Sequence, residues 1–119
     1  MKRKAKWDDN IEATFGDSED LVIKHNGTNN VIQSITGDLK VGVANTFAVQ
    51  NDTFDENMIT AAENGEVSLF HNNVKKLDTR TTGIRITGIS EYADNTAAIA
   101  GGLTTGDVYR TGDLLKIVH

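Results

Sequence analysis

Tight-turn signals recur along the whole chain and divide it into short pieces. Glycine stands beside asparagine or aspartate at Gly16-Asp17, Asn26-Gly27, Gly37-Asp38, Asn64-Gly65, Gly106-Asp107 and Gly112-Asp113. Such pairs supply the positive-φ residues that hairpin turns require. The pieces between the turns have the length of strands, and the chain contains no proline. The spacing therefore predicts an all-β fold of short strands, arranged as hairpins or as β-helix-like or β-prism-like repeats.

The expected strands cover most of the first 90 residues. They are residues 11–15, 20–25, 30–35, 39–43, 47–50, 58–61, 66–71, 74–78 and 84–89. Apolar and polar residues alternate in several of them, as in Val67-Ser68-Leu69 and Ile84-Arg85-Ile86. Alternation with a period of two places one face of a sheet against apolar groups and the other toward water.

One segment near the C-terminus departs from this pattern. Residues 92–103 are rich in alanine, with Tyr92, Thr96, Ile99 and Leu103 at helical spacing. Ser90 is expected to cap this helix, and Gly101-Gly102 to end it. A strand over residues 114–118 follows. Together these features predict three parts: a basic N-terminal arm (1–7), a β-repeat body (8–90), and a C-terminal module of a short helix and a β-hairpin (91–119).

The body contains a weak internal repeat. Residues 20–42 align without gaps on residues 66–88, so that His25-Asn26 falls on His71-Asn72 and Gly42 falls on Gly88. The matches lie at turns and at apolar positions. Two similar units, each too small to bury its own apolar face, are expected to stack on each other or on another subunit.

Charge and composition exclude several classes of function. Four of the 12 basic residues lie in the arm, at Lys2, Arg3, Lys4 and Lys6, which leaves 8 basic against 17 acidic residues elsewhere. An acidic body repels phosphate, so nucleic acid is not an expected partner. No apolar run is long enough for a membrane span, and no signal peptide is recognisable. The absence of cysteine excludes disulfides, cysteine nucleophiles and zinc–thiolate sites.

No catalytic, cofactor or metal site is expected. His25 and His71 could meet on a three-fold axis as metal ligands, but hydrogen bonding of a strand-end histidine to a turn is the preferred interpretation. The acidic residues around Asp17 lack the pattern of a calcium loop, and Glu56 and Glu63 lack an aromatic sugar platform beside them. The serines have no nucleophile motif.

Several stretches resemble β-rich units in structural proteins of marine tailed bacteriophages, which are tail-fibre-like or other virion components. The matching residues are Phe15-Gly16-Asp17, Asp20-Leu21, Glu56-Asn57-Met58-Ile59, Asn73-Val74-Lys75-Lys76-Leu77 and, in the C-terminal module, Tyr109-Arg110-Thr111-Gly112-Asp113. The chain has about one set of these units, whereas long fibres carry many, and the basic arm lies outside the pattern. The resemblance implies a non-enzymatic virion protein, a fibre component or capsid decoration (cement) protein, that assembles as a homotrimer.

Two sets of residues are expected to make contacts in such an assembly. The arm, with Trp7 as anchor, is expected to dock Lys2, Arg3, Lys4 and Lys6 on an acidic patch of another capsid or tail protein. A solvated arm, or a Trp7 that packs on its own chain, is the alternative. The expected subunit interface is apolar and consists of Leu21, Ile23, Leu39, Val41, Val67, Leu69, Ile84 and Ile86. A monomeric β-sandwich and a module that binds a host receptor or glycan are the competing interpretations.

Overall fold

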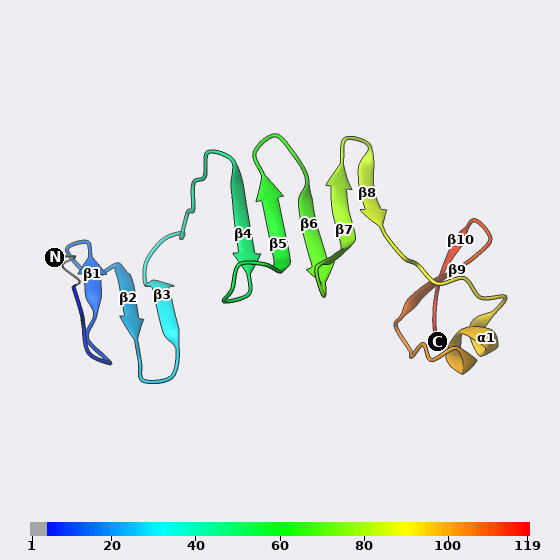
Figure 1. Cartoon of the computed structure of the whole chain (residues 1–119), viewed down its shortest axis with the longest axis horizontal. Helices are drawn as coiled ribbons and strands as arrows, with labels where there is room; N and C mark the ends of the chain where they lie inside the picture. Colours follow the sequence, from blue (N-terminus) through cyan, green and yellow to red (C-terminus); the bar gives the residue numbers. More distant parts are fainter. Residues whose placement is uncertain (1–4) are drawn as a thin grey trace. The chain divides into compact units, whose positions relative to one another are not determined.

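The computed structural model describes residues 5–119, which form two compact units, one ending at Gly42 and one beginning at Val43 (Figure 1). Both units are built on short antiparallel strands, gathered in three sheets, and the described residues contain one short helix near the C-terminus. The mostly β fold with one C-terminal helix is therefore confirmed. That helix has 6 residues, and no helix of the described chain could cross a membrane.

The first unit is a three-stranded sheet in the order β1–β2–β3. Its strands are β1 (Ala13–Phe15), β2 (Leu21–His25) and β3 (Asn30–Ser34). The β2–β3 turn is closed by a 3.0 Å hydrogen bond from the backbone N–H of Asn26 to the carbonyl of Asn29. Val22, the second residue of β2, is the buried apolar residue of this unit.

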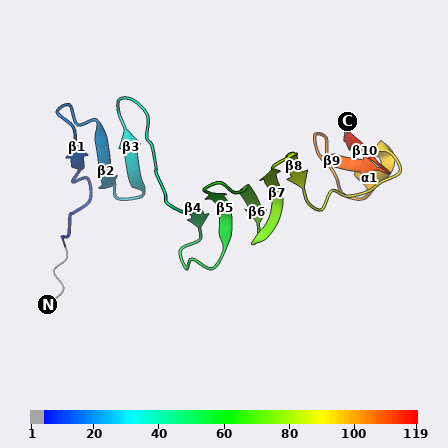
Figure 2. The ribbon, with the colours of Figure 1, turned by 90° about the horizontal axis from the view of Figure 1, so that it is seen from above.

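The second unit begins with a five-stranded antiparallel sheet in chain order. The strands are β4 (Thr46–Gln50), β5 (Asn57–Ala62), β6 (Val67–His71), β7 (Val74–Arg80) and β8 (Gly83–Ile86). Seen from above, they form one layer (Figure 2). Asn72 and Asn73 connect β6 to β7, both with positive φ, as a two-residue hairpin turn requires. Every strand pairs with the strand before it, so sequence neighbours are also neighbours in space.

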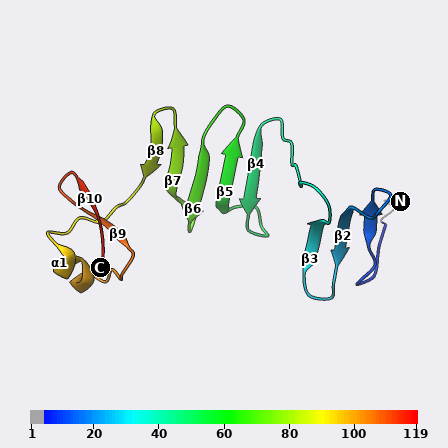
Figure 3. The ribbon, with the colours of Figure 1, turned by 180° about the vertical axis from the view of Figure 1, so that it is seen from behind.

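The chain ends in a small module with its own core. Figure 3 shows α1 (Asn95–Ala100) beside the hairpin of β9 (Val108–Thr111) and β10 (Leu114–Ile117). Ala98, Tyr109 and Val118 are buried together, with Tyr92 and Leu103 packed against them. The rings of Tyr92 and Tyr109 meet edge to face at 6.4 Å. The module therefore packs a core that the single-layer sheets lack.

Two local expectations are wrong. Residues 39–43 form no strand, so Leu39 and Val41 lie in the irregular segment between β3 and β4. No strand of the described residues pairs with this segment, and alternation alone does not form a strand. The cap of α1 is Asp94 rather than Ser90, because the Asp94 carboxylate accepts a 2.8 Å hydrogen bond from the N–H of Ala97.

The repeat has a structural counterpart. β2 and β6 occupy corresponding positions of the aligned segments, and each ends at a histidine, His25 or His71. Each pairs with the next strand as an antiparallel hairpin. The connections differ, since residues 26–29 join one pair and Asn72-Asn73 the other. The two hairpins therefore share a strand pattern but have different turns.

Candidate interaction surface

The five-stranded sheet presents one face made of apolar side chains. The pairing register places Val49, Ile59, Leu69, Leu77 and Ile86 in a row that crosses all five strands. A second row contains Phe47, Ala61 and Val67. Ile84 lies on the same face, two residues before Ile86. We call these nine residues the apolar face.

Within its own unit, this face is uncovered. Seven of its nine residues are large apolar residues with exposed side chains. Their exposed fraction ranges from 36% at Val49 to 65% at Ile84. The substantial contacts of β4–β8 with other elements are those between neighbouring strands of the sheet itself. Contiguous apolar patches of this kind on a folded protein mark interaction sites. The apolar face therefore has the character of a surface that another chain covers.

The opposite face carries a network of paired charges. Ser68 of β6, Asp78 of β7 and Arg85 of β8 form a row, and the Ser68 and Asp78 residues have no exposed surface. Nε of Arg85 donates a 3.0 Å hydrogen bond to Oδ1 of Asp78, and NH1 of Arg80 donates a 3.3 Å hydrogen bond to Oδ2. Buried charge is tolerated when it is paired in this way. The buried carboxylate of Asp78 is thus paired within its own chain.

The charge balance at Asp78 follows from these neighbours. Burial raises the pKa of Asp78, but the hydrogen bond and charge of Arg85, together with the charges of Lys75 and Arg80, outweigh it and hold the pKa below its usual value. Glu66 extends the network by pairing with Lys75 and, at 3.9 Å, with Arg80. The Ser68 hydroxyl is the exception, since it is buried without a hydrogen-bond partner.

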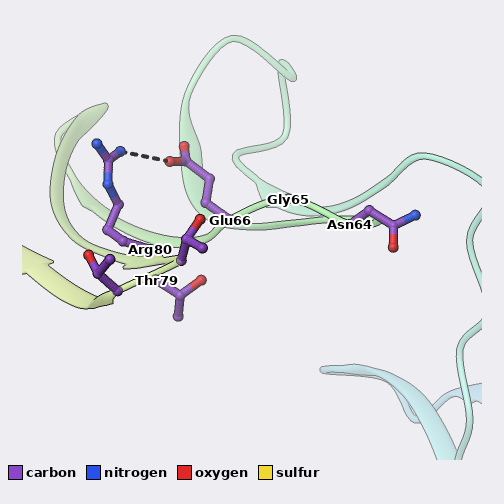
Figure 4. A pocket seen from close by; sticks show the side chains of 7 residues that line it. Asn64, Gly65, Glu66, Thr79 and Arg80 are labelled. Carbon is purple, nitrogen blue, oxygen red and sulfur yellow. Dashed lines mark ion pairs between the residues drawn. The ribbon is translucent and has the colours of Figure 1, made fainter.

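A polar hollow lies at one end of the sheet, beside the β5–β6 and β7–β8 turns (Figure 4). Its volume is about 560 Å³, and the lining residues are Asn64, Gly65, Glu66, Thr79, Arg80, Thr81 and Thr82. Figure 4 shows Arg80 and Glu66 joined by their ion pair at its rim. Hydroxyl, amide and charged groups line it without an aromatic ring or a histidine. It can offer hydrogen bonds, but its lining contains no pairing of a nucleophile with a base.

The expected interface residues fall into three groups. Val67, Leu69, Ile84 and Ile86 all lie on the apolar face. Leu21 and Ile23 lie on one face of the three-stranded sheet, where Leu21 pairs with Phe15 and Ile23 with Ile32. Leu39 and Val41 are exposed in the irregular segment and belong to neither face. That these residues contact another subunit stays a prediction.

The arm is described only in part. Lys2, Arg3 and Lys4 lie outside the described residues. Lys6 and Trp7 are described, both are exposed, and Trp7 has 55% of its surface accessible. Docking of the arm therefore stays a prediction as well.

The aromatic residues are divided between the interior and the surface. Tyr109 is buried, whereas Phe15, Phe47 and Phe54 are exposed, Phe54 by 76%. Phe54 lies at the β4–β5 loop with a positive φ of 61°, an unfavourable conformation for a bulky residue. Asn51 holds this loop through its side chain. Its Oδ1 accepts hydrogen bonds from the backbone N–H groups of Asp55 and Glu56, both at 3.1 Å.

His25 hydrogen-bonds at a strand end, as expected. Its Nδ1 lies 2.8 Å from Oδ1 of Asp9 and 3.3 Å from the backbone nitrogen of Gly27 in the following turn. Within residues 5–119, no three histidine or carboxylate side chains are gathered as metal ligands.

Sequence reasoning missed five members of the apolar face: Phe47, Val49, Ile59, Ala61 and Leu77. Alternation was visible in Phe47-Ala48-Val49, and the β4–β5 pairing would have placed Ile59 opposite Val49. Bulges between Val49 and Gln50 and between Leu69 and Phe70 interrupt the register, and no residue pattern announced them.

Comparison of the chain with models of protein families, with curated proteins and with solved structures gave no match. The described residues form a β protein whose five-stranded sheet has paired charges on one face and an exposed apolar row on the other. What this arrangement can do chemically is bind another surface through apolar contact.

Proposed function

We propose that the protein is a non-enzymatic structural protein of a phage virion, a tail-fibre-like or capsid decoration (cement) component. In this proposal it assembles as a β-rich homotrimer and attaches to a larger capsid or tail protein. The resemblance of residues 15–25, 56–59 and 73–77 to such proteins supplies the class. The contrast between the two faces of the β4–β8 sheet is the observation that supports assembly.

The occupant of the apolar face is another copy of the same chain. Apolar side chains from each of the five strands lie side by side on this face, so an identical face offers apolar surface of the same extent. Cyclic symmetry allows equal faces to pack around one axis. The opposite face, with the paired charges of Asp78, Arg80 and Arg85, then points away from the axis. Three copies rather than two follow from the resemblance alone.

Light scattering on the purified chain tests assembly. A trimer has three times the chain mass of 12.9 kDa and persists on dilution to low micromolar concentration. A folded species of 12.9 kDa that is stable on dilution contradicts the proposal.

Attachment is the second part of the proposal and depends on the arm. Exposed ion pairs are screened beyond a Debye length of about 10 Å at 0.1 M salt, so docking through Lys2, Arg3, Lys4 and Lys6 should weaken as salt is added. Deletion of residues 1–7 is expected to reduce incorporation into particles. Unchanged incorporation shows that the arm is not the tether. Localisation of the tagged chain in reconstructed particles tests the virion assignment directly.

Phe54 favours a second candidate function, the recognition of a glycan or receptor on a host surface. An exposed aromatic ring can stack on a sugar face, and the polar groups of Asn51, Thr53 and Asp55 hold its loop in place. A glycan array separates the two functions. A reproducible ligand that is lost on Phe54→Ala supports recognition, whereas no ligand leaves the structural function as the better one.

A further inference from the structure

The turn between β2 and β3 joins three features that promote a reaction of asparagine with its own backbone. Asn26 precedes Gly27, and glycine has no side chain to hinder attack by its backbone nitrogen on the neighbouring amide. Oδ1 of Asn26 accepts the backbone N–H groups of Thr28 at 3.1 Å and Asn29 at 2.8 Å. The N–H of Gly27 points at Nδ1 of His25, 3.3 Å away. The three features are an unhindered nucleophile beside its electrophile, donors that stabilise negative charge on Oδ1, and a base.

We propose that Asn26 is a self-modification site, where the folded hairpin promotes conversion of the asparagine to aspartate and isoaspartate. This inference is independent of the proposed virion function. It requires only residues of the β2–β3 turn and water. Asn26, Gly27, Thr28 and Asn29 are all exposed, so water reaches them.

The reaction proceeds in two stages. The Gly27 nitrogen bonds to Cγ of Asn26 while its proton passes to Nδ1 of His25, and the charge that develops on Oδ1 is stabilised by the N–H groups of Thr28 and Asn29. The bond from Cγ to Nδ2 then breaks, and Nδ2 leaves as ammonia with the proton that His25 returns. Water opens the resulting cyclic imide at either carbonyl, which gives aspartate or isoaspartate. The net change is addition of water and loss of ammonia.

Asp9 controls whether His25 can act as the base. Oδ1 of Asp9 lies 2.8 Å from the same Nδ1 that faces Gly27. A protonated Nδ1 donates to Asp9 and cannot accept from Gly27, whereas an unprotonated Nδ1 accepts from Gly27 and loses the bond to Asp9. Because Asp9 and Gly27 compete for the same Nδ1, and Asp9 is the nearer of the two, Asp9 restrains the reaction.

Asn64-Gly65 supplies a matched control in the same chain. It is the same dipeptide, it is also exposed, and Asn64 has a positive φ of 55°. The N–H of Gly65 donates instead to the carbonyl oxygen of Ala62 at 3.1 Å, which is a far weaker base than imidazole. No side-chain hydrogen bond of Asn64 is found among residues 5–119. The proposal therefore predicts that two identical dipeptides react at different rates.

The experiment is incubation of the whole chain at neutral pH, followed by digestion at mildly acidic pH and mass spectrometry of the two Asn-Gly peptides. In the folded protein, Asn26 is expected to convert about tenfold faster than Asn64, a fraction of what base and oxyanion catalysis contribute in enzymes. In urea the two rates should become similar. If Asn64 keeps pace with Asn26 in the folded protein, the proposal is wrong.

Two variants test the assigned roles. His25→Gln keeps a hydrogen-bonding side chain but removes the base, so conversion at Asn26 should slow while conversion at Asn64 stays unchanged. Asp9→Ala releases Nδ1 and should accelerate conversion at Asn26. An unchanged rate at Asn26 in His25→Gln overturns the base role and with it the proposal. Should either variant fail to fold, the comparison of Asn26 and Asn64 in the unmodified chain still decides.

Discussion

Asp78 and Arg85 stand opposite each other on β7 and β8, and Nε of Arg85 donates a 3.0 Å hydrogen bond to Oδ1 of Asp78. Asp78 has no exposed surface, while Arg85 keeps about half of its side chain, 49%, in contact with solvent. A buried carboxylate depends on its donors, because water cannot replace them. This pair therefore satisfies the buried carboxylate of Asp78 within one chain.

Arg85→Met is expected to lower the thermal stability of the protein. The substitution leaves the buried Asp78 carboxylate with Arg80, whose NH1 is 3.3 Å away, as its remaining hydrogen-bond donor. Lys40→Met is the control, since Lys40 and Asp38 are 3.7 Å apart and 85% and 80% exposed, and exposed pairs contribute little. The double variant Asp78→Leu, Arg85→Met removes the stranded charge and should be more stable than Arg85→Met alone. Equal midpoints for Arg85→Met and Lys40→Met in a thermal melt contradict this account.

Ile59→Lys is expected to dissociate the assembly into single chains. Ile59 lies in the row of five apolar residues, so lysine places a charge in the centre of the proposed interface, where its desolvation is unfavourable. Ala48→Lys is the control. Ala48 is exposed and pairs with Thr60 in the regular part of the β4–β5 ladder, and as the residue between Phe47 and Val49 it lies on the opposite face. Light scattering should show a lower mass of the assembly for Ile59→Lys only. If both variants have the same mass, the apolar face is not the interface.

The fold was predictable where local patterns determine structure. Turn pairs such as Asn64-Gly65 and alternation in Val67-Ser68-Leu69 indicated the hairpins, because turn geometry and side-chain period are local properties. Leu39-Lys40-Val41 has the same alternation but forms no strand. Strand formation also needs a partner strand, and this requirement is not visible in the segment itself. Alternation therefore predicted which residues can pair, not which do.

The candidate surface was predictable only in part. Val67, Leu69, Ile84 and Ile86 were found from alternation, whereas Leu77 was missed because its strand reads Val74-Lys75-Lys76-Leu77, which breaks the period. A bulge between Leu69 and Phe70 restores the register that places Leu77 opposite Leu69. The Asp78–Arg85 pair was likewise not recognised. Its signal was the placement of the two residues at equal distances around the β7–β8 turn, which becomes meaningful once the pairing of Arg80 with Gly83 is known.

Gly101→Ala is expected to destabilise the C-terminal module by about 1–3 kcal/mol through overpacking. Gly101 has an ordinary φ of −79°, so alanine is conformationally acceptable there. A Cβ at this position would collide with the ring of Tyr92, which packs on the module core. Gly42→Ala is the control, because a Cβ at Gly42 meets nothing within 4 Å. Faster hydrogen exchange at the Leu103 amide, which donates to Ala98, should appear in Gly101→Ala and be absent in Gly42→Ala.

Acid is expected to destabilise the protein below about pH 4, the usual pKa of aspartate. Three carboxyl groups have lowered pKa values in the folded chain. The side chains of Asn51 and Thr53 lower the pKa of Asp55, and the backbone and side chain of Thr104 lower that of Asp107. At Asp78, burial acts in the opposite direction and the hydrogen bond and charge of Arg85 prevail, together with the charges of Lys75 and Arg80.

Stability falls with pH because the unfolded chain binds protons at a higher pH than the folded chain does. Above about pH 4 these carboxyls are ionised in both the folded and the unfolded chain, so the stability they contribute is fully present. As the pH falls further, the unfolded chain takes up protons while the folded chain does not, and that stability is lost until the folded carboxyls also protonate. Urea midpoints measured between pH 5 and about 2 should decline through this window. Asp107→Asn removes one of the three groups and should make the decline of the urea midpoint shallower. These carboxyls do not control acid stability if the midpoint rises as the pH falls below 4. The same conclusion follows if Asp107→Asn leaves the decline unchanged.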